Sequence, residues 1–125
     1  MSNTEKYLAI RNLVNSTEKR ALVYGASFSE FVILRTIEAG GAAGIRRVDL
    51  AEQVGLSVSG VTRALAPLEK LGYVEHREEE LDARVRKVSL TTTGRELFED
   101  IQKDVQRLMD QIAPDIELLA KQLIK

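Results

Sequence analysis

The chain has 125 residues, 44% of them hydrophobic, and a formal net charge of −1. This length predicts one domain, two at most, with enough buried surface for a core of its own. The absence of cysteine excludes disulfides and thiolate metal sites, and the single histidine, His76, excludes a multi-histidine metal centre. No apolar run approaches the roughly 20 residues of a membrane span, and the polar first eleven residues do not resemble a signal peptide. We therefore expect a cytoplasmic protein without metal, cofactor or membrane partner.

The first predicted helix spans residues 5–24, where apolar side chains recur at spacings of three and four. This stripe comprises Tyr7, Ile10, Val14, Thr17, Ala21 and Tyr24. Ser27 and Glu30 then have the spacing of a capping box, which predicts a second helix from residue 28 to about residue 39. Its inward residues are expected to be Phe31, Leu34 and Ile37. The glycine-rich segment 40–44 should end it.

Residues 48–54 and 58–70 predict a pair of helices joined by a tight turn at Gly55. Ser57 precedes the second helix as its N-cap, and the small Ala51 allows the two helices to approach closely. Helical spacing places one set of side chains inward: Val58, Val61, Leu65 and Leu68. The opposite face carries Ser59, Arg63, Ala66 and Lys70, with Thr62 at its flank. Pro67 predicts a bend or an early loosening near the end of this helix.

A β-hairpin is expected next, with strands at residues 73–77 and 84–90 and a charged turn at 78–83. In the second strand Val88 and Leu90 should face inward, and Lys87 and Ser89 outward. One of the threonines 91–93 then caps a helix that runs to about Ile112. The pair Ala113-Pro114 should interrupt this helix, and a terminal helix should follow over residues 115–124. The apolar stripes of the first and last helices could form a private core, but their extent favours dimerisation.

Two motifs resemble the MarR family of bacterial transcriptional regulators. The first runs from Leu50-Ala51 through Val54-Gly55-Leu56-Ser57 to Gly72-Tyr73-Val74, and the second from Asp82-Ala83-Arg84 to Gly94-Arg95. The resemblance implies a mainly α fold with a small β-wing, namely a winged helix-turn-helix over residues 28–94 within a single MarR-like domain, 1–125. Segments 4–24 and 92–124 would be dimerisation helices. It further implies a homodimer that binds a pseudo-palindromic operator in double-stranded DNA, often as a repressor. Many family members also respond to a small aromatic or phenolic effector.

Carried over by position, the resemblance implies a set of DNA-binding residues. These are Ser57, Ser59, Thr62 and Arg63 in the major groove and, on the wing, Arg84 and Arg86. Asp82 would orient the wing, and Ala83 stands where the family often has arginine. The alternative for Arg84 and Arg86 is pairing with the acidic residues 78–82 across the hairpin. Arg46 and Arg47 are as well explained by a solvated loop as by phosphate contact.

The charge pattern keeps a second class of function open. Between Ile45 and Arg95 there are nine Lys/Arg and eight Asp/Glu residues, so phosphate binding depends on the placement of single arginines and not on a broad positive field. The acidic run Glu78-Glu79-Glu80 fits a winged-helix module for protein–protein contact without specific DNA binding. An enzyme is not expected, because no nucleophile–base pair or phosphate-binding glycine loop is present in the sequence, and His76 has the place of an ordinary strand residue.

Overall fold

The computed structural model describes residues 1–18, 27–79 and 82–123. The chain divides into two compact units, one comprising Met1–Phe28 and Ile101–Lys125, the other Ser29–Asp100. Helix α1 (Asn3–Glu18) lies in the first unit, and helix α5 (Thr92–Leu123) begins in the second and ends in the first. The predicted residues 19–24 of the first helix and residue 124 of the last lie outside the described residues.

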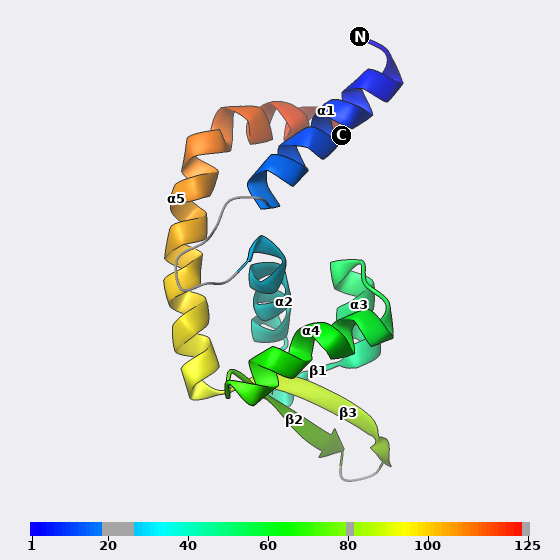
Figure 1. Ribbon diagram of the computed structural model, residues 1–125, viewed down its shortest axis with the longest axis vertical. Helices are drawn as coiled ribbons and strands as arrows, with labels where there is room; N and C mark the ends of the chain where they lie inside the picture. Colours follow the sequence, from blue (N-terminus) through cyan, green and yellow to red (C-terminus); the bar gives the residue numbers. More distant parts are fainter. Residues whose placement is uncertain (19–26, 80–81, 124–125) are drawn as a thin grey trace. The chain divides into compact units, whose positions relative to one another are not determined.

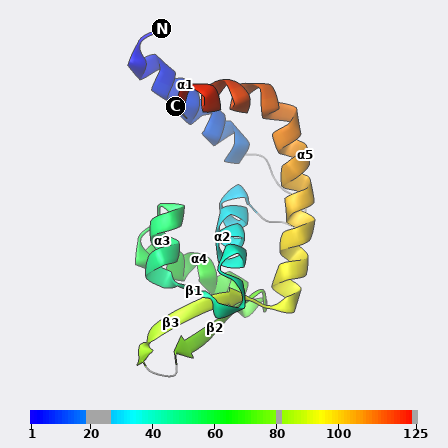
Figure 2. The same ribbon diagram turned by 180° about the vertical axis from the view of Figure 1, so that it is seen from behind.

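The second unit contains the helix-turn-helix and its wing. Helix α2 (Phe28–Ala39) is followed by the short helix η2 (Gly41–Ala43), strand β1 (Ile45–Arg46) and helices α3 (Arg47–Val54) and α4 (Val58–Lys70). Strands β2 (Val74–Glu79) and β3 (Asp82–Leu90) complete an antiparallel sheet of order β1-β3-β2. Seen from both sides, β2 and β3 project beyond helices α3 and α4 (Figures 1 and 2). The expected mainly α winged helix-turn-helix is confirmed.

The turn between α3 and α4 forms for the reason that the sequence suggested. Gly55 has φ of 73°, a left-handed conformation that glycine adopts without a Cβ penalty, and the Leu56 N–H donates to the Ala51 carbonyl at 3.0 Å. Ala51 itself is buried. Helix α4 continues through Pro67 to Lys70, so the expected loosening at the proline does not interrupt it.

The core of this unit is built from the predicted inward faces. Fully or nearly fully buried side chains are Phe31, Leu34 and Ile37 of α2, Val61, Leu65 and Leu68 of α4, and Val88 and Leu90 of β3. The prediction for Val58 was wrong, since it is 45% exposed. Val58 is the first residue of α4, and the buried side of this helix begins one turn later, at Val61.

The hairpin differs from its prediction at three points. Both strands are longer, so that Glu79 pairs with Asp82 and the predicted six-residue turn is reduced to the segment around residues 80–81, which lies outside the described part. Strand β1 was not predicted; it has two residues and pairs with Val88 and Lys87 of β3. Ser89 was expected to face outward but is buried at the base of the wing, where residues of η2 and of the start of α5 line the same cavity.

Helix α5 begins on a tightly packed corner. The Thr91 hydroxyl accepts from the Gly94 N–H at 3.0 Å and donates to the Gly72 carbonyl at 2.6 Å, which identifies Thr91 as the cap among the three threonines. Phe98, Ile101, Val105 and Leu108 recur along this helix at spacings of three and four, and all four are buried. Phe98 stacks on Phe31 with ring centroids 5.8 Å apart.

The predicted break at Pro114 was wrong. Helix α5 runs without interruption from Thr92 to Leu123 with Pro114 inside it, although its ribbon curves in the C-terminal part (Figure 1). A proline removes one backbone hydrogen bond, and a helix can accommodate it by bending. One continuous helix therefore stands where the sequence predicted two separate helices. Among the described residues, no helix combines the length and apolarity that crossing a membrane requires.

Candidate nucleic-acid interface

The N-terminus of α4 is an open, capped helix end. The Ser57 hydroxyl accepts from the Gly60 N–H at 3.0 Å, so Ser57 is the N-cap that the sequence predicted. The same oxygen lies 3.2 Å from the Ser59 hydroxyl, and both serines are exposed. A capped N-terminus directs its remaining N–H groups and the positive end of the helix dipole toward solvent, which is the arrangement that binds phosphate oxygens.

The outer face of α4 is exposed along its whole length. Its exposed residues are Ser59, Thr62, Arg63, Ala66 and Lys70, opposite the buried Val61, Leu65 and Leu68. Within residues 1–18, 27–79 and 82–123, Arg63 makes no hydrogen bond or ion pair. An arginine held on a rigid helix without a protein partner keeps all five N–H donors for an external acceptor. This face therefore suits a ligand with surface acceptors, such as the edges of bases.

Thr62 is held by a residue that sequence analysis left unassigned. Its hydroxyl accepts from Arg47 Nη1 at 3.0 Å, while Nη2 of the same guanidinium lies 2.9 Å from His76 Nε2. His76 Nε2 in turn lies 2.8 Å from Glu69 Oε2. Arg47 thus joins the start of α3 to the middle of α4 and to β2, and is part of neither a solvated loop nor an exposed phosphate site. Its partners are 15 and 29 residues away, so no local pattern could have identified them.

The two contacts of His76 Nε2 compete. A ring nitrogen presents either a hydrogen or a lone pair, whereas Arg47 requires a lone pair and the Glu69 carboxylate requires a hydrogen. Only one of the two contacts is a hydrogen bond in any one protonation state or tautomer of His76. The role of His76 is therefore structural, at the junction of α3, α4 and β2, and not that of an isolated strand residue.

The wing residues lie on β3, at the end of the hairpin. Arg86 is exposed and stands opposite Glu78 in the antiparallel register. Arg84 lies two residues nearer the tip, and the structure describes its backbone but not its side chain. Contact of Arg86 with a groove and its pairing with an acidic residue of the hairpin both stay predictions.

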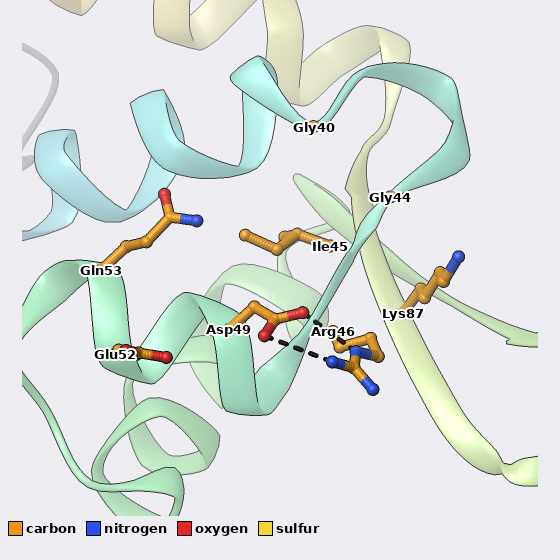
Figure 3. A pocket seen from close by; sticks show the side chains of 8 residues that line it. All are labelled: Gly40, Gly44, Ile45, Arg46, Asp49, Glu52, Gln53 and Lys87. Carbon is orange, nitrogen blue, oxygen red and sulfur yellow. Dashed lines mark hydrogen bonds and ion pairs between the residues drawn. The ribbon is translucent and has the colours of Figure 1, made fainter.

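A hollow of about 710 Å³ lies beside β1 and α3 (Figure 3). Its charged lining contains Arg46, Asp49, Glu52 and Lys87, and Arg46 Nε donates to Asp49 Oδ2 at 2.9 Å. Arg46 is therefore engaged with the first turn of α3. Two cations beside two anions favour neither an anionic nor a cationic ligand, so we assign no ligand to this hollow.

A steep helix pair with an exposed second helix, followed by a projecting antiparallel hairpin, defines a winged helix-turn-helix protein. The model of the MarR family matches residues 24–85. The chain belongs to the MarR family, as its motifs indicated.

Proteins of similar sequence are named as transcriptional regulators. The chain is 32% identical over 80 residues to the uncharacterized HTH-type transcriptional regulator YdgJ of Bacillus subtilis, covering 64% of this chain and 49% of YdgJ. It therefore spans about half the length of that relative. It is 27% identical over 110 residues to the HTH-type transcriptional regulator SarZ of Staphylococcus epidermidis, covering 88% and 68% of the two chains.

Solved structures share the fold. The crystal structure of the transcriptional regulator PcaV of Streptomyces coelicolor, with its natural ligand, superposes with a TM-score of 0.76 at 19% identity and covers 95% of this chain and 87% of PcaV. At this identity the likeness concerns the fold alone. YdgJ, SarZ and PcaV are each named as transcriptional regulators.

Proposed function

We propose that this protein is a sequence-specific DNA-binding transcriptional regulator in which α4 enters the major groove. The observation that carries the proposal is the exposed outer face of α4, with an Arg63 that no described residue engages and an open, serine-capped N-terminus. Family membership and the regulator relatives support it. Ser57 and Ser59 would contact phosphates at the helix N-terminus, and Arg63 would pair with guanine or phosphate. Thr62 would contact DNA only if its hydroxyl kept a lone pair beside Arg47.

The wing would add contacts in the adjacent minor groove. Arg84 would enter the groove and Arg86 would contact the backbone, while Glu78 opposite Arg86 would oppose phosphate binding. We therefore expect α4 to supply most of the sequence discrimination and the wing to supply a smaller, salt-dependent share of the affinity.

The functional unit would be a homodimer on a pseudo-palindromic operator. The first unit exposes large apolar side chains, with Tyr7, Leu8 and Val14 of α1 and Leu118 of α5 each 48% exposed or more. Apolar side chains gathered on helices in this way are typical of an interface. Two copies of α4 would then read half-sites about one helical turn apart.

The proposal includes regulation by a small aromatic or phenolic effector, usually with repression, because many members of the MarR family respond to such compounds. The structure of PcaV contains its natural ligand, and an effector here would act by binding one spacing of the two reading helices better than another.

Selection of bound duplexes from a random pool tests the proposal. We expect an enriched inverted repeat, bound by two protomers, with affinity that falls as salt concentration rises in proportion to the phosphates neutralised. The alternative, a winged-helix module for protein–protein contact, predicts no enrichment and no salt slope for duplex DNA. Analytical ultracentrifugation of the protein with the selected duplex gives the stoichiometry, and one protomer per repeat would contradict the dimer.

A further inference from the structure

A second cavity, of about 450 Å³, lies where the base of the wing meets the start of α5. Its lining comes from η2, both strands of the wing and the start of α5, and it includes Glu75, Arg77, Ser89, Thr92, Thr93 and Arg95. All of these residues belong to the second unit. The volume lies within the roughly 300–1,000 Å³ that is usual for small-molecule sites.

Ser89 is the feature that packing does not explain. Only 2% of this residue is exposed, and its hydroxyl has no hydrogen-bond partner in the part of the chain that the structure describes. Ser89 stands directly opposite Glu75 in the β2–β3 register, so both side chains leave the same face of the sheet, the face on which the cavity lies. A buried hydroxyl without a partner is costly. The oxygen itself is buried, so a turn of the Ser89 side chain about χ1 would bring it to an acceptor on a ligand in the cavity.

Apart from the Glu75 carboxylate, which would oppose an anion, the cavity is lined by the start of α5, which offers backbone donors. The Thr91 cap takes the N–H of Gly94, and the Arg95 N–H begins the helical ladder by donating to the Thr91 carbonyl at 2.9 Å. The N–H groups of Thr92 and Thr93 precede that ladder and have no partner within the helix, and they lie at the positive end of a 32-residue helix.

Two guanidinium groups add positive charge. Arg77 Nη2 lies 3.8 Å from Glu75 Oε1, and Arg95 Nε lies 3.5 Å from Glu38 Oε2. Both separations exceed the 2.7–2.9 Å of a charge-assisted hydrogen bond, and each involves one of several guanidinium nitrogens. About half of each arginine side chain is exposed. Both arginines can therefore turn additional N–H groups toward an anion, against the opposing charges of Glu75 and Glu38.

We propose that this cavity is a binding site for a small oxyanion, the phosphate or carboxylate group of a free metabolite, held by Arg77, Arg95, the first turn of α5 and the Ser89 hydroxyl. No residue of α4 lines this cavity, whereas Ser57 caps the N-terminus of that helix. The bound anion would thus not compete with DNA for the outer face of α4. It would join the base of the wing to α5.

The test is titration of the full-length, ¹⁵N-labelled chain with inorganic phosphate, followed by the amide resonances of Thr92 and Thr93 at constant ionic strength. A second titration uses acetate. We expect saturable shifts with an apparent Kd of roughly 1 mM or below. Tighter binding of phosphate assigns a phosphorylated ligand, and tighter binding of acetate assigns a carboxylic acid. Shifts that grow linearly with either anion would overturn the proposal.

Variants decide whether the named residues hold the anion. Arg95→Gln should weaken binding roughly fivefold or more. The matched control is Arg107→Gln, which removes an exposed arginine on the same helix outside the cavity and should leave binding unchanged. Ser89→Ala should be at least as stable as the wild type without anion, because it removes an unpartnered buried hydroxyl, yet bind more weakly. Equal effects of Arg95→Gln and Arg107→Gln, or unchanged binding by Ser89→Ala, would contradict the assignment. DNA takes no part in these titrations, so their failure would leave the proposed DNA-binding function intact.

Discussion

Position 94 requires glycine because of a close backbone neighbour and not because of an unusual backbone conformation. A Cβ at this position would overlap the Tyr73 carbonyl oxygen and lie 2.8 Å from the Tyr73 carbonyl carbon. Both are backbone atoms, and the same carbonyl accepts the Thr91 N–H at 3.1 Å. No side-chain rotation can relieve the overlap, so Gly94→Ala must separate the first turn of α5 from Tyr73, the residue that precedes β2.

The expected cost follows from three contributions. Overpacking against backbone costs about 3 kcal/mol, and weakening the Thr91–Tyr73 hydrogen bond costs about 1 kcal/mol. Replacing a helical glycine by alanine returns up to about 1 kcal/mol in propensity. The free energy of unfolding should therefore fall by about 3 kcal/mol, which for a chain of this size lowers Tm by roughly 10 °C.

Thermal unfolding followed by circular dichroism measures this change. Gly55→Ala is the matched control, because Gly55 has φ of 73° and open space where a Cβ would stand. It should cost about 1 kcal/mol through backbone conformation alone. A Gly94→Ala variant as stable as the wild type, or no less stable than Gly55→Ala, would refute the packing argument.

Three further predictions concern residues that form or support the outer face of α4. Ser57→Ala should lower stability by about 1 kcal/mol through loss of the N-cap, measured by urea unfolding, and should also weaken DNA binding. Arg47→Met should weaken DNA binding roughly tenfold without any change in helix content by circular dichroism, because Thr62 and His76 lose the group that joins them. His76→Gln should reduce affinity less than Arg47→Met, since it keeps a polar partner for Arg47; an equal loss in a filter-binding assay would contradict this order.

Local signals in the sequence sufficed where the determinants of structure were local. The predicted helices, from 28 to about 39 and from 58 to 70, match α2 and α4, because the 3–4 spacing lies within each segment and the end signals lie beside it. Gly55 was identified for the same reason. Val58 was wrong because helical spacing alone does not show where a packed face ends.

The remaining errors concern contacts between distant segments. Strand β1 has two residues and exists only through pairing with Val88 and Lys87, more than forty positions away. Ser89 alternates with apolar residues as an outward position should, but it is buried at the base of the wing, where the distant η2 lines the same cavity. Pro114 was predicted to break the helix, but the helix continues through it. Whether a proline ends or only bends a helix depends on its packing, which the local sequence does not show.

The candidate site was predictable only in part. The family motif and the helical face identified Ser57, Ser59, Thr62 and Arg63, and the structure places all four exposed at the start or outer face of α4. The motif did not indicate Arg47, whose interactions with Thr62 and His76 span two other elements. Whether Arg84 and Arg86 contact DNA stays a prediction.

The most direct test of the central claim is the ratio of dissociation constants for the selected duplex and a scrambled duplex, measured at one salt concentration for the wild type and Arg63→Ala. If the outer face of α4 reads bases, the substitution should reduce that ratio roughly tenfold or more while the dimer stays intact, because a bidentate arginine–guanine pair contributes about 1–3 kcal/mol of discrimination. An unchanged ratio would show that sequence is not read through this face.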